Sequence, residues 1–195
     1  MEEISFDEIK RLQNGERMIF DRIILIYKQR VTALCFKYMR NMEEALDSSQ
    51  EVFVAVYSNI KSFRFQSKFS TWLYRLTVNN CINRLKTIKR RESLMTAGLP
   101  DGDGGFVELA EMLRDKVKLP DEEMELKELG TTVLKELERF SAADKSVIIL
   151  LDMEGFSCAE AGDILGKPEG SIRSSASRTR RKLREMLERK GVSLR

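Results

Sequence analysis

Apolar residues recur at intervals of three and four along most of the chain, which is the spacing of one face of an α-helix. A short run near the N-terminus contains Ile9 and Leu12. Three longer runs predict three longer helices, the last over about residues 70–90. Their apolar positions are Phe20, Ile24, Tyr27, Val31, Leu34 and Tyr38, then Val52, Phe53, Val56, Tyr57 and Ile60, then Val78, Cys81, Ile82, Leu85 and Ile88. The pattern predicts an all-α fold.

Near the C-terminus the polar residues indicate two short helices joined by a tight turn. Ser157 and Glu160 form a capping box, which predicts that a helix begins at Ser157. Gly166 is placed to adopt the left-handed conformation that ends a helix, and Pro168 stands where a second helix can start. Gly162 lies inside the first helix, where glycine costs about 1 kcal/mol relative to alanine. This order of helix, glycine turn and helix predicts a helix-turn-helix.

The second of these helices has an apolar face and a basic face. Ile172, Ala176, Leu183 and Leu187 share the apolar face. From Lys167 onward the chain holds ten basic residues against three acidic ones, an excess that suits binding to DNA phosphates and guanines. A solvated basic helix end is the alternative interpretation. The capping box, glycine turn and proline together favour DNA binding.

Two segments in the middle of the chain also carry groups that bind nucleic acids. Aromatic, basic and hydroxyl residues alternate over residues 62–72, and such a mixture can capture single-stranded bases. The competing interpretation is that Phe63, Phe69 and Trp72 are core anchors, and we favour it for Phe69 and Trp72. The predicted helix that follows presents Asn79, Asn83, Lys86 and Arg90 on one side. That row suits DNA contacts and an ordinary solvated face equally well.

Composition narrows the class of protein. The 195 residues are 42% hydrophobic and 33% charged, without an apolar stretch long enough to cross a bilayer or a signal-peptide pattern, so we expect a cytoplasmic protein. Cys35, Cys81 and Cys158 are far apart, and the chain has no histidine. We therefore expect the cysteines to pack as small apolar residues, and we expect no metal, no cofactor and no enzymatic activity.

The net charge of +3 hides three blocks of alternating sign. Residues 84–91 hold five basic and no acidic side chains, whereas residues 92–128 hold eleven acidic and four basic ones. The acidic block also contains Pro100, Gly102, Gly104, Gly105 and Pro120, which are typical of a turn-rich linker. We predict two small helical domains, residues 1–92 and 125–195, joined by an acidic flexible linker over residues 93–124.

At this point the residues resemble a known family, the extracytoplasmic-function sigma factors of the sigma-70 family. The matching stretches of its region two are Gln50-Glu51-Val52-Phe53, Ser62-Phe63-Arg64, Phe69-Ser70-Thr71-Trp72-Leu73-Tyr74-Arg75-Leu76 and Asn79. The matching stretches of its region four, within residues 137–183, are Glu154-Gly155-Phe156-Ser157, Leu165-Gly166, Gly170-Ser171-Ile172-Arg173-Ser174 and Arg178. The resemblance covers nearly the whole chain, with both regions in the family's order.

The resemblance implies a bacterial transcription initiation factor that binds the RNA polymerase core and promoter DNA. The residues it places against the clamp helices of the polymerase, at the protein surface, are Asp47, Gln50, Glu51 and Phe53. Those it places at the melted minus-ten element are Ser62, Phe63, Arg64, Phe65, Gln66, Ser67, Lys68, Asn79, Asn80, Asn83, Arg84 and Lys86. Those it places in the major groove of the minus-thirty-five element are Arg173, Ser174, Ser177, Arg178 and Arg181.

The resemblance further implies that an anti-sigma factor, membrane-associated or soluble, regulates the protein by covering these surfaces. Two other classes stay open. A stand-alone helix-turn-helix regulator would bind its operator tightly on its own, often as a dimer on a palindrome. A helical enzyme of unknown chemistry is disfavoured by the missing histidine and by the absence of a glycine-rich phosphate loop.

Overall fold

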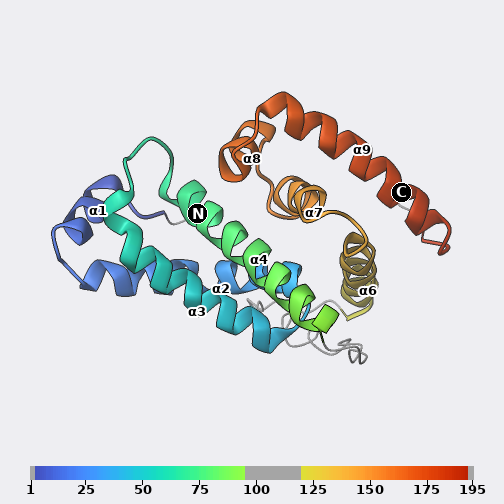
Figure 1. Cartoon of the computed structure of the whole chain (residues 1–195), viewed down its shortest axis with the longest axis horizontal. Helices are drawn as coiled ribbons and strands as arrows, with labels where there is room; N and C mark the ends of the chain where they lie inside the picture. Colours follow the sequence, from blue (N-terminus) through green and yellow to red (C-terminus); the bar gives the residue numbers. More distant parts are fainter. Residues whose placement is uncertain (1–2, 95–119, 193–195) are drawn as a thin grey trace. The chain divides into compact units, whose positions relative to one another are not determined.

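The computed structural model describes residues 3–94 and 120–192, and every regular element in these ranges is a helix (Figure 1). The chain divides into two compact units, Met1–Leu113 and Arg114–Arg195. The division falls within the predicted linker, whose residues 95–119 lie outside the described ranges. The turns predicted around Pro100 and Gly105 fall on these residues. Pro120, which we had assigned to that linker, begins a helix instead. The fold class is confirmed, whereas the exact domain limits stay a prediction.

Within residues 3–94, the described part of the first unit, four α-helices pack together. They are α1 (Phe6–Gln13), α2 (Met18–Met39), α3 (Met42–Asn59) and α4 (Phe69–Leu94), with a 3-10 turn at Ile60–Ser62 after α3. Figure 1 shows α3 beside α2 and α4. Helix α1 begins with a capping box of Ser5 and Glu8, and the side chain of Asn41 caps α3. Both helix starts are therefore fixed by side-chain hydrogen bonds to the backbone.

The predicted apolar stripes form most of the core of the first unit. Their buried members are Tyr27, Val31, Leu34, Tyr38, Val52, Phe53, Val56, Ile60, Val78 and Cys81. The half-buried members are Phe20, Ile24, Ile82, Leu85 and Ile88. Tyr57 is an exception, because its side chain is 44% exposed and makes an edge-to-face contact with Phe20 at 5.0 Å. Cys35 and Cys81 are buried in the core, as expected for packing residues, and the Cys81 thiol donates to Cys35 Sγ at 3.7 Å.

The second unit contains α6 (Pro120–Leu137), α7 (Ala142–Ile148), a π-helical turn (Ile149–Met153), α8 (Cys158–Leu165) and α9 (Glu169–Glu188). Its core is built from leucine and isoleucine side chains of these helices. They include Leu137, Ile148, Ile149, Leu150, Ile164, Ile172 and Leu187. The buried carboxylate of Glu136, at the end of α6, pairs with Lys190 just beyond α9 and so ties these two helix ends together.

Helices α8 and α9 form the predicted helix-turn-helix. The Ser157 hydroxyl accepts a hydrogen bond from the backbone N–H of Glu160 at 3.2 Å, and the Glu160 carboxylate accepts one from the Ser157 N–H at 3.0 Å. Gly166 ends α8 in the left-handed conformation at φ 64°. Pro168 is the residue before α9 rather than its first residue, with extended backbone angles that prepare the helix start.

Gly162 gives α8 room for a close approach of the turn. A Cβ atom at this position would lie 2.7 Å from the carbonyl oxygen of Lys167. The backbone N–H of Lys167 in turn donates to the carbonyl of Gly162 at 2.9 Å. The helix propensity lost at this glycine is thus the cost of a tight junction between α8 and α9.

Candidate nucleic-acid interface

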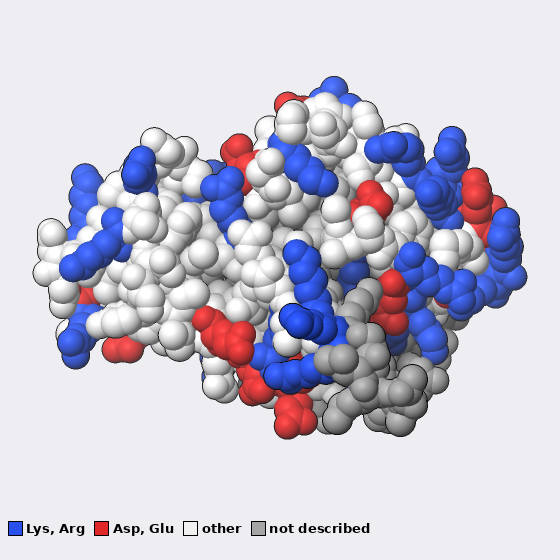
Figure 2. Space-filling view, in the orientation of Figure 1, with Lys and Arg blue, Asp and Glu red and all other residues white. Residues whose placement is uncertain are grey.

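The exposed face of α9 carries all five residues that we had assigned to the minus-thirty-five element. Arg173, Ser174, Ser177, Arg178 and Arg181 are exposed. On the opposite face, Ile172, Ala176, Thr179, Leu183 and Leu187 are buried. Figure 2 shows basic side chains gathered over this part of the second unit. A helix held by one face with a cationic opposite face has the form of a major-groove reader.

Local contacts on the exposed face are weak. Arg173 pairs with Glu169 one helical turn away at 2.6 Å, and the Nε of Arg178 donates to the carbonyl of Ser174 at 3.3 Å. Such exposed pairs contribute only a few tenths of a kcal/mol. These guanidinium groups therefore remain easy to redirect toward phosphate or base edges.

Two neighbours on the same helix have structural roles instead. The guanidinium of Arg180 forms a bidentate contact with Asp152, with a shortest distance of 2.5 Å, and this hydrogen bonding raises the pKa of Arg180. The Ser175 hydroxyl donates to Asp144 Oδ1 at 2.7 Å, which joins α9 to the start of α7. The predicted set of major-groove contacts had included Arg178 and Arg181 and had left Arg180 out.

The loop over residues 62–68 is built on an aromatic cluster. The ring of Phe63 lies 6.0 Å from Phe69 and 5.5 Å from Trp72, measured between centroids. The amide of Gln13 donates to the backbone carbonyls of Ile60 at 2.8 Å and Phe63 at 3.0 Å. These contacts anchor the base of the loop to the folded unit.

Burial separates the predicted minus-ten residues of this loop into two groups. Phe63 is only 4% exposed, so its side chain packs as a core anchor, and its assignment to the minus-ten element stays a prediction. Phe69 is fully buried, as we had favoured, and Trp72 is half-buried. Ser62, Arg64, Gln66 and Lys68 are exposed, whereas Phe65 and Ser67 are half-buried.

Phe65 is held in an unusual conformation. Its backbone lies in the left-handed region at φ 57°, which is uncommon for a bulky residue. Its ring lies 5.0 Å from Phe63 and 5.4 Å from Phe6, and the Lys10 ammonium lies 5.7 Å from its centroid. The contribution of α1 to this loop was not foreseen, although Phe6 and Lys10 share one face of a predicted helix.

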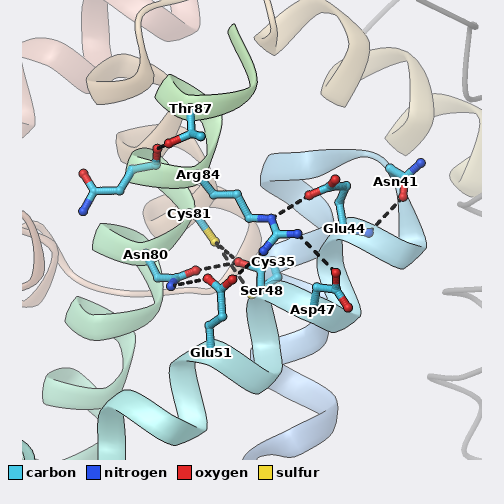
Figure 3. A network of polar contacts seen from close by, with 11 residues as sticks. Cys35, Asn41, Glu44, Asp47, Ser48, Glu51, Asn80, Cys81, Arg84 and Thr87 are labelled. Carbon is cyan, nitrogen blue, oxygen red and sulfur yellow. Dashed lines mark hydrogen bonds and ion pairs between the residues drawn. The ribbon is translucent and has the colours of Figure 1, made fainter. Parts of the chain in front are cut away.

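The polar side of α4 also divides into two sets. Asn79, Asn83 and Lys86 are exposed, as a DNA-facing surface requires. Asn80 and Arg84 turn instead toward α3, where they bind Ser48, Glu51 and neighbouring carboxylates (Figure 3). The structure thus brings two predicted DNA contacts together with two predicted polymerase contacts, Asp47 and Glu51.

Three of the four residues predicted to contact polymerase lie on an exposed stripe of helix α3. Asp47, Gln50 and Glu51 are exposed, and Figure 2 shows acidic side chains over this part of the unit. Phe53 is only 7% exposed, so the prediction that it lies at the surface is wrong. It shares a helix face with buried Ser49 and Val56, four residues before it and three after it.

The stripe continues through two apolar residues. Tyr57 had been assigned to the core, and Val54 had not been assigned. Val54 is 66% exposed and Tyr57 is 44% exposed. Both follow Asp47 and Gln50 at helical spacing, so the stripe is acidic at one end and apolar at the other. The sequence could have predicted this stripe, because Asp47, Gln50, Val54 and Tyr57 follow each other at intervals of three and four residues.

Two segments of the chain match known family models. Residues 23–91 match the family model Sigma-70 region 2, and residues 132–183 match Sigma-70, region 4. The chain is 32% identical to the ECF RNA polymerase sigma factor SigW of Bacillus subtilis, over 96% of this chain and 98% of that protein. It is 29% identical to the RNA polymerase sigma-H factor of Pseudomonas aeruginosa, over 92% of each chain.

Solved structures share the fold. CnrH in complex with the cytosolic domain of CnrY matches with a TM-score of 0.64 at 17% identity, over 93% of this chain and 95% of that one. RpoE in complex with the anti-sigma factor NepR from Bartonella quintana matches with a TM-score of 0.61 at 23% identity, over 87% and 96%. Across the described ranges, no helix combines the length and apolarity needed to span a membrane. The near full-length similarity to SigW and the two region matches show that the chain belongs to the extracytoplasmic-function family of RNA polymerase sigma factors.

Proposed function

We propose that this sigma factor divides promoter recognition between three surfaces. The exposed stripe of α3 binds the clamp helices of the polymerase core. The loop over residues 62–68 and the outer face of α4 bind the melted minus-ten element. The basic face of α9 enters the major groove of the minus-thirty-five element. The observation that carries this proposal is the outward position of every predicted α9 contact, with the apolar face of α9 buried.

The chemistry of each surface supports its assigned partner. Arg178 and Arg181 offer bidentate donors that suit guanine and phosphate. Arg64 and Lys68 flank the half-buried aromatic Phe65, a combination that holds a strand while a base stacks. The polymerase core performs nucleotide addition, so this subunit supplies specificity rather than catalysis.

The two units bind modestly when free and strongly when polymerase fixes their spacing. Linking two binding modules strengthens binding only where geometry allows both to engage at once. We therefore propose that the free chain binds promoters weakly. An anti-sigma factor that covers the α3 stripe or the α9 face would keep it inactive, and the fold neighbour RpoE is seen in complex with the anti-sigma factor NepR.

Run-off transcription with a genomic fragment library tests the function directly. Purified bacterial core polymerase is used with and without this protein, and new transcript starts are sequenced. We expect new starts that share minus-ten and upstream motifs. No new starts, together with no binding to core, would contradict the proposal and favour a stand-alone regulator, which tight operator binding by the free chain would then confirm.

A further inference from the structure

A single arginine on α4 joins three carboxylates on α3 (Figure 3). The Nε of Arg84 donates to Glu44 at 2.6 Å, Nη1 to Glu51 at 2.7 Å, and Nη2 to Asp47 at 3.3 Å. The Arg84 side chain is only 19% exposed, whereas those of Asp47 and Glu51 are more than half exposed. The guanidinium of Arg84 is thus largely buried beneath the carboxylates, whereas Asp47 and Glu51 remain exposed to solvent.

A second bridge reinforces the same contact. The amide of Asn80 donates to Glu51 at 3.1 Å and accepts a hydrogen bond from the Ser48 hydroxyl at 2.6 Å. Glu51 therefore has two donors from α4, one on each side of the carboxylate. Partial burial would lower the pKa of Arg84, but the hydrogen bond to Glu44 and the charges of Glu44, Glu51 and Asp47 together outweigh burial and raise that pKa.

The spacing of the carboxylates explains why they need this arginine. Glu44, Asp47 and Glu51 follow each other at three and four residues, so their like charges stand on one side of α3. Without a cation the side chains would repel and spread into solvent. With Arg84 they are held in one geometry, and three carboxylates against one guanidinium leave an excess of negative charge at the surface.

We propose that Arg84 is a positioning residue of the polymerase-binding surface and not a contact to promoter DNA. It fixes Asp47 and Glu51 before polymerase arrives, which reduces the entropy lost when a basic partner binds them. To reach DNA, Arg84 would have to leave three carboxylates at once. Asn83 and Lys86 are exposed on the same helix and need no such exchange. This inference rests on the proposed function, because it assumes that α3 binds core.

The test compares Arg84→Gln with Lys86→Gln. The second variant is the matched control, because it also removes one positive charge from α4, but from the exposed side of the helix. Affinity for core polymerase is measured by titration, and promoter binding by the assembled holoenzyme is measured across a salt series. For Arg84→Gln we expect core affinity to fall about tenfold with an unchanged salt slope. For Lys86→Gln we expect unchanged core affinity and a salt slope smaller by about one.

Arg84→Lys supplies the second variant, because lysine keeps the charge but cannot bridge three carboxylates with a planar fork. We expect it to lose part of the core affinity, and it decides the matter if Arg84→Gln does not fold. Wild-type core affinity in a folded Arg84 variant, or a salt slope reduced as in Lys86→Gln, would overturn the inference. Absence of core binding by the wild-type protein would instead overturn the proposed function.

Discussion

Arg178 and Arg180 are separated by one residue, yet their surroundings give them different tasks. Arg180 is held by Asp152, whereas Arg178 lies on the exposed face with one weak contact to a backbone carbonyl. Asp144, like Arg180, has a structural role. It accepts hydrogen bonds from Ser141 and Ser175, and these bonds lower the pKa of the Asp144 carboxyl. Arg180 and Asp144 therefore stabilise the fold through their partners, whereas Arg178 remains available to donate hydrogen bonds to another molecule.

The lowered pKa of Asp144 predicts that the stability of the second unit depends on pH. The folded pKa of Asp144 lies below its ordinary value of 3.8, so its stabilising effect is complete above that value and is lost as the pH falls through the folded pKa. We expect Asp144→Asn to destabilise the second unit by about 1 kcal/mol at neutral pH. The variant should also lose less stability than the wild type on acidification. Urea unfolding from neutral pH to pH 3 measures both effects.

Asp163→Asn is the matched control, because Asp163 is an exposed aspartate of the same unit. It should leave the free energy of unfolding and its pH dependence close to wild type. Parallel pH curves for wild type and Asp144→Asn would contradict the role of the Asp144 hydrogen bonds.

At the scale of elements, α9 combines a packing face with a recognition face, so substitutions on the two faces should separate. We expect Arg178→Ala to weaken binding of holoenzyme to the minus-thirty-five element by about 1–3 kcal/mol, while core binding persists. Arg180→Ala should instead lower the thermal stability of the second unit, because it leaves Asp152 without its bidentate partner. Promoter binding and thermal unfolding of both variants test this division. Unchanged promoter binding by Arg178→Ala would refute α9 as the upstream reader.

Capping allows a second prediction at this scale. The Ser157 hydroxyl and the Glu160 carboxylate satisfy backbone N–H groups at the start of α8. We expect Ser157→Ala to cost about 1 kcal/mol of stability in the second unit. Ser174→Ala is a suitable comparison, because that hydroxyl bonds only a carbonyl within its own helix and is exposed. Equal unfolding midpoints for the two variants would contradict the capping role.

Sequence patterns predicted these elements well because their signals are local. Ser157, Gly166 and the apolar spacing of α9 depend on bonds within a few residues, and all three were correct. The sequence was less informative where tertiary contacts decide the position of a side chain. Phe53 and Phe63 turn into the core, and Arg84 meets carboxylates from a helix far away in sequence. No spacing rule distinguishes an arginine that binds DNA from one that crosses to another helix.

At the scale of the whole molecule, polymerase connects two units that each have a core of their own. Binding to core and binding to DNA are then separate steps. The effect of a substitution on transcription should therefore depend on the sigma factor concentration in a way that differs between the two units. When core polymerase is limiting, added sigma factor can compensate for a weaker core contact. It cannot compensate for a weaker promoter contact, because the number of holoenzymes is fixed by the core present.

We therefore expect Gln50→Ala combined with Glu51→Ala to reduce run-off transcription at low sigma concentration and to recover toward wild type as the variant is titrated against limiting core. Arg178→Ala should reach a lower plateau that further protein does not raise. Asp21→Ala, an exposed acidic residue of α2, serves as control for the loss of negative charge and should follow the wild-type curve. A double variant that matches wild type at every concentration would refute the α3 surface, because two of its exposed polar side chains would then make no contact with polymerase.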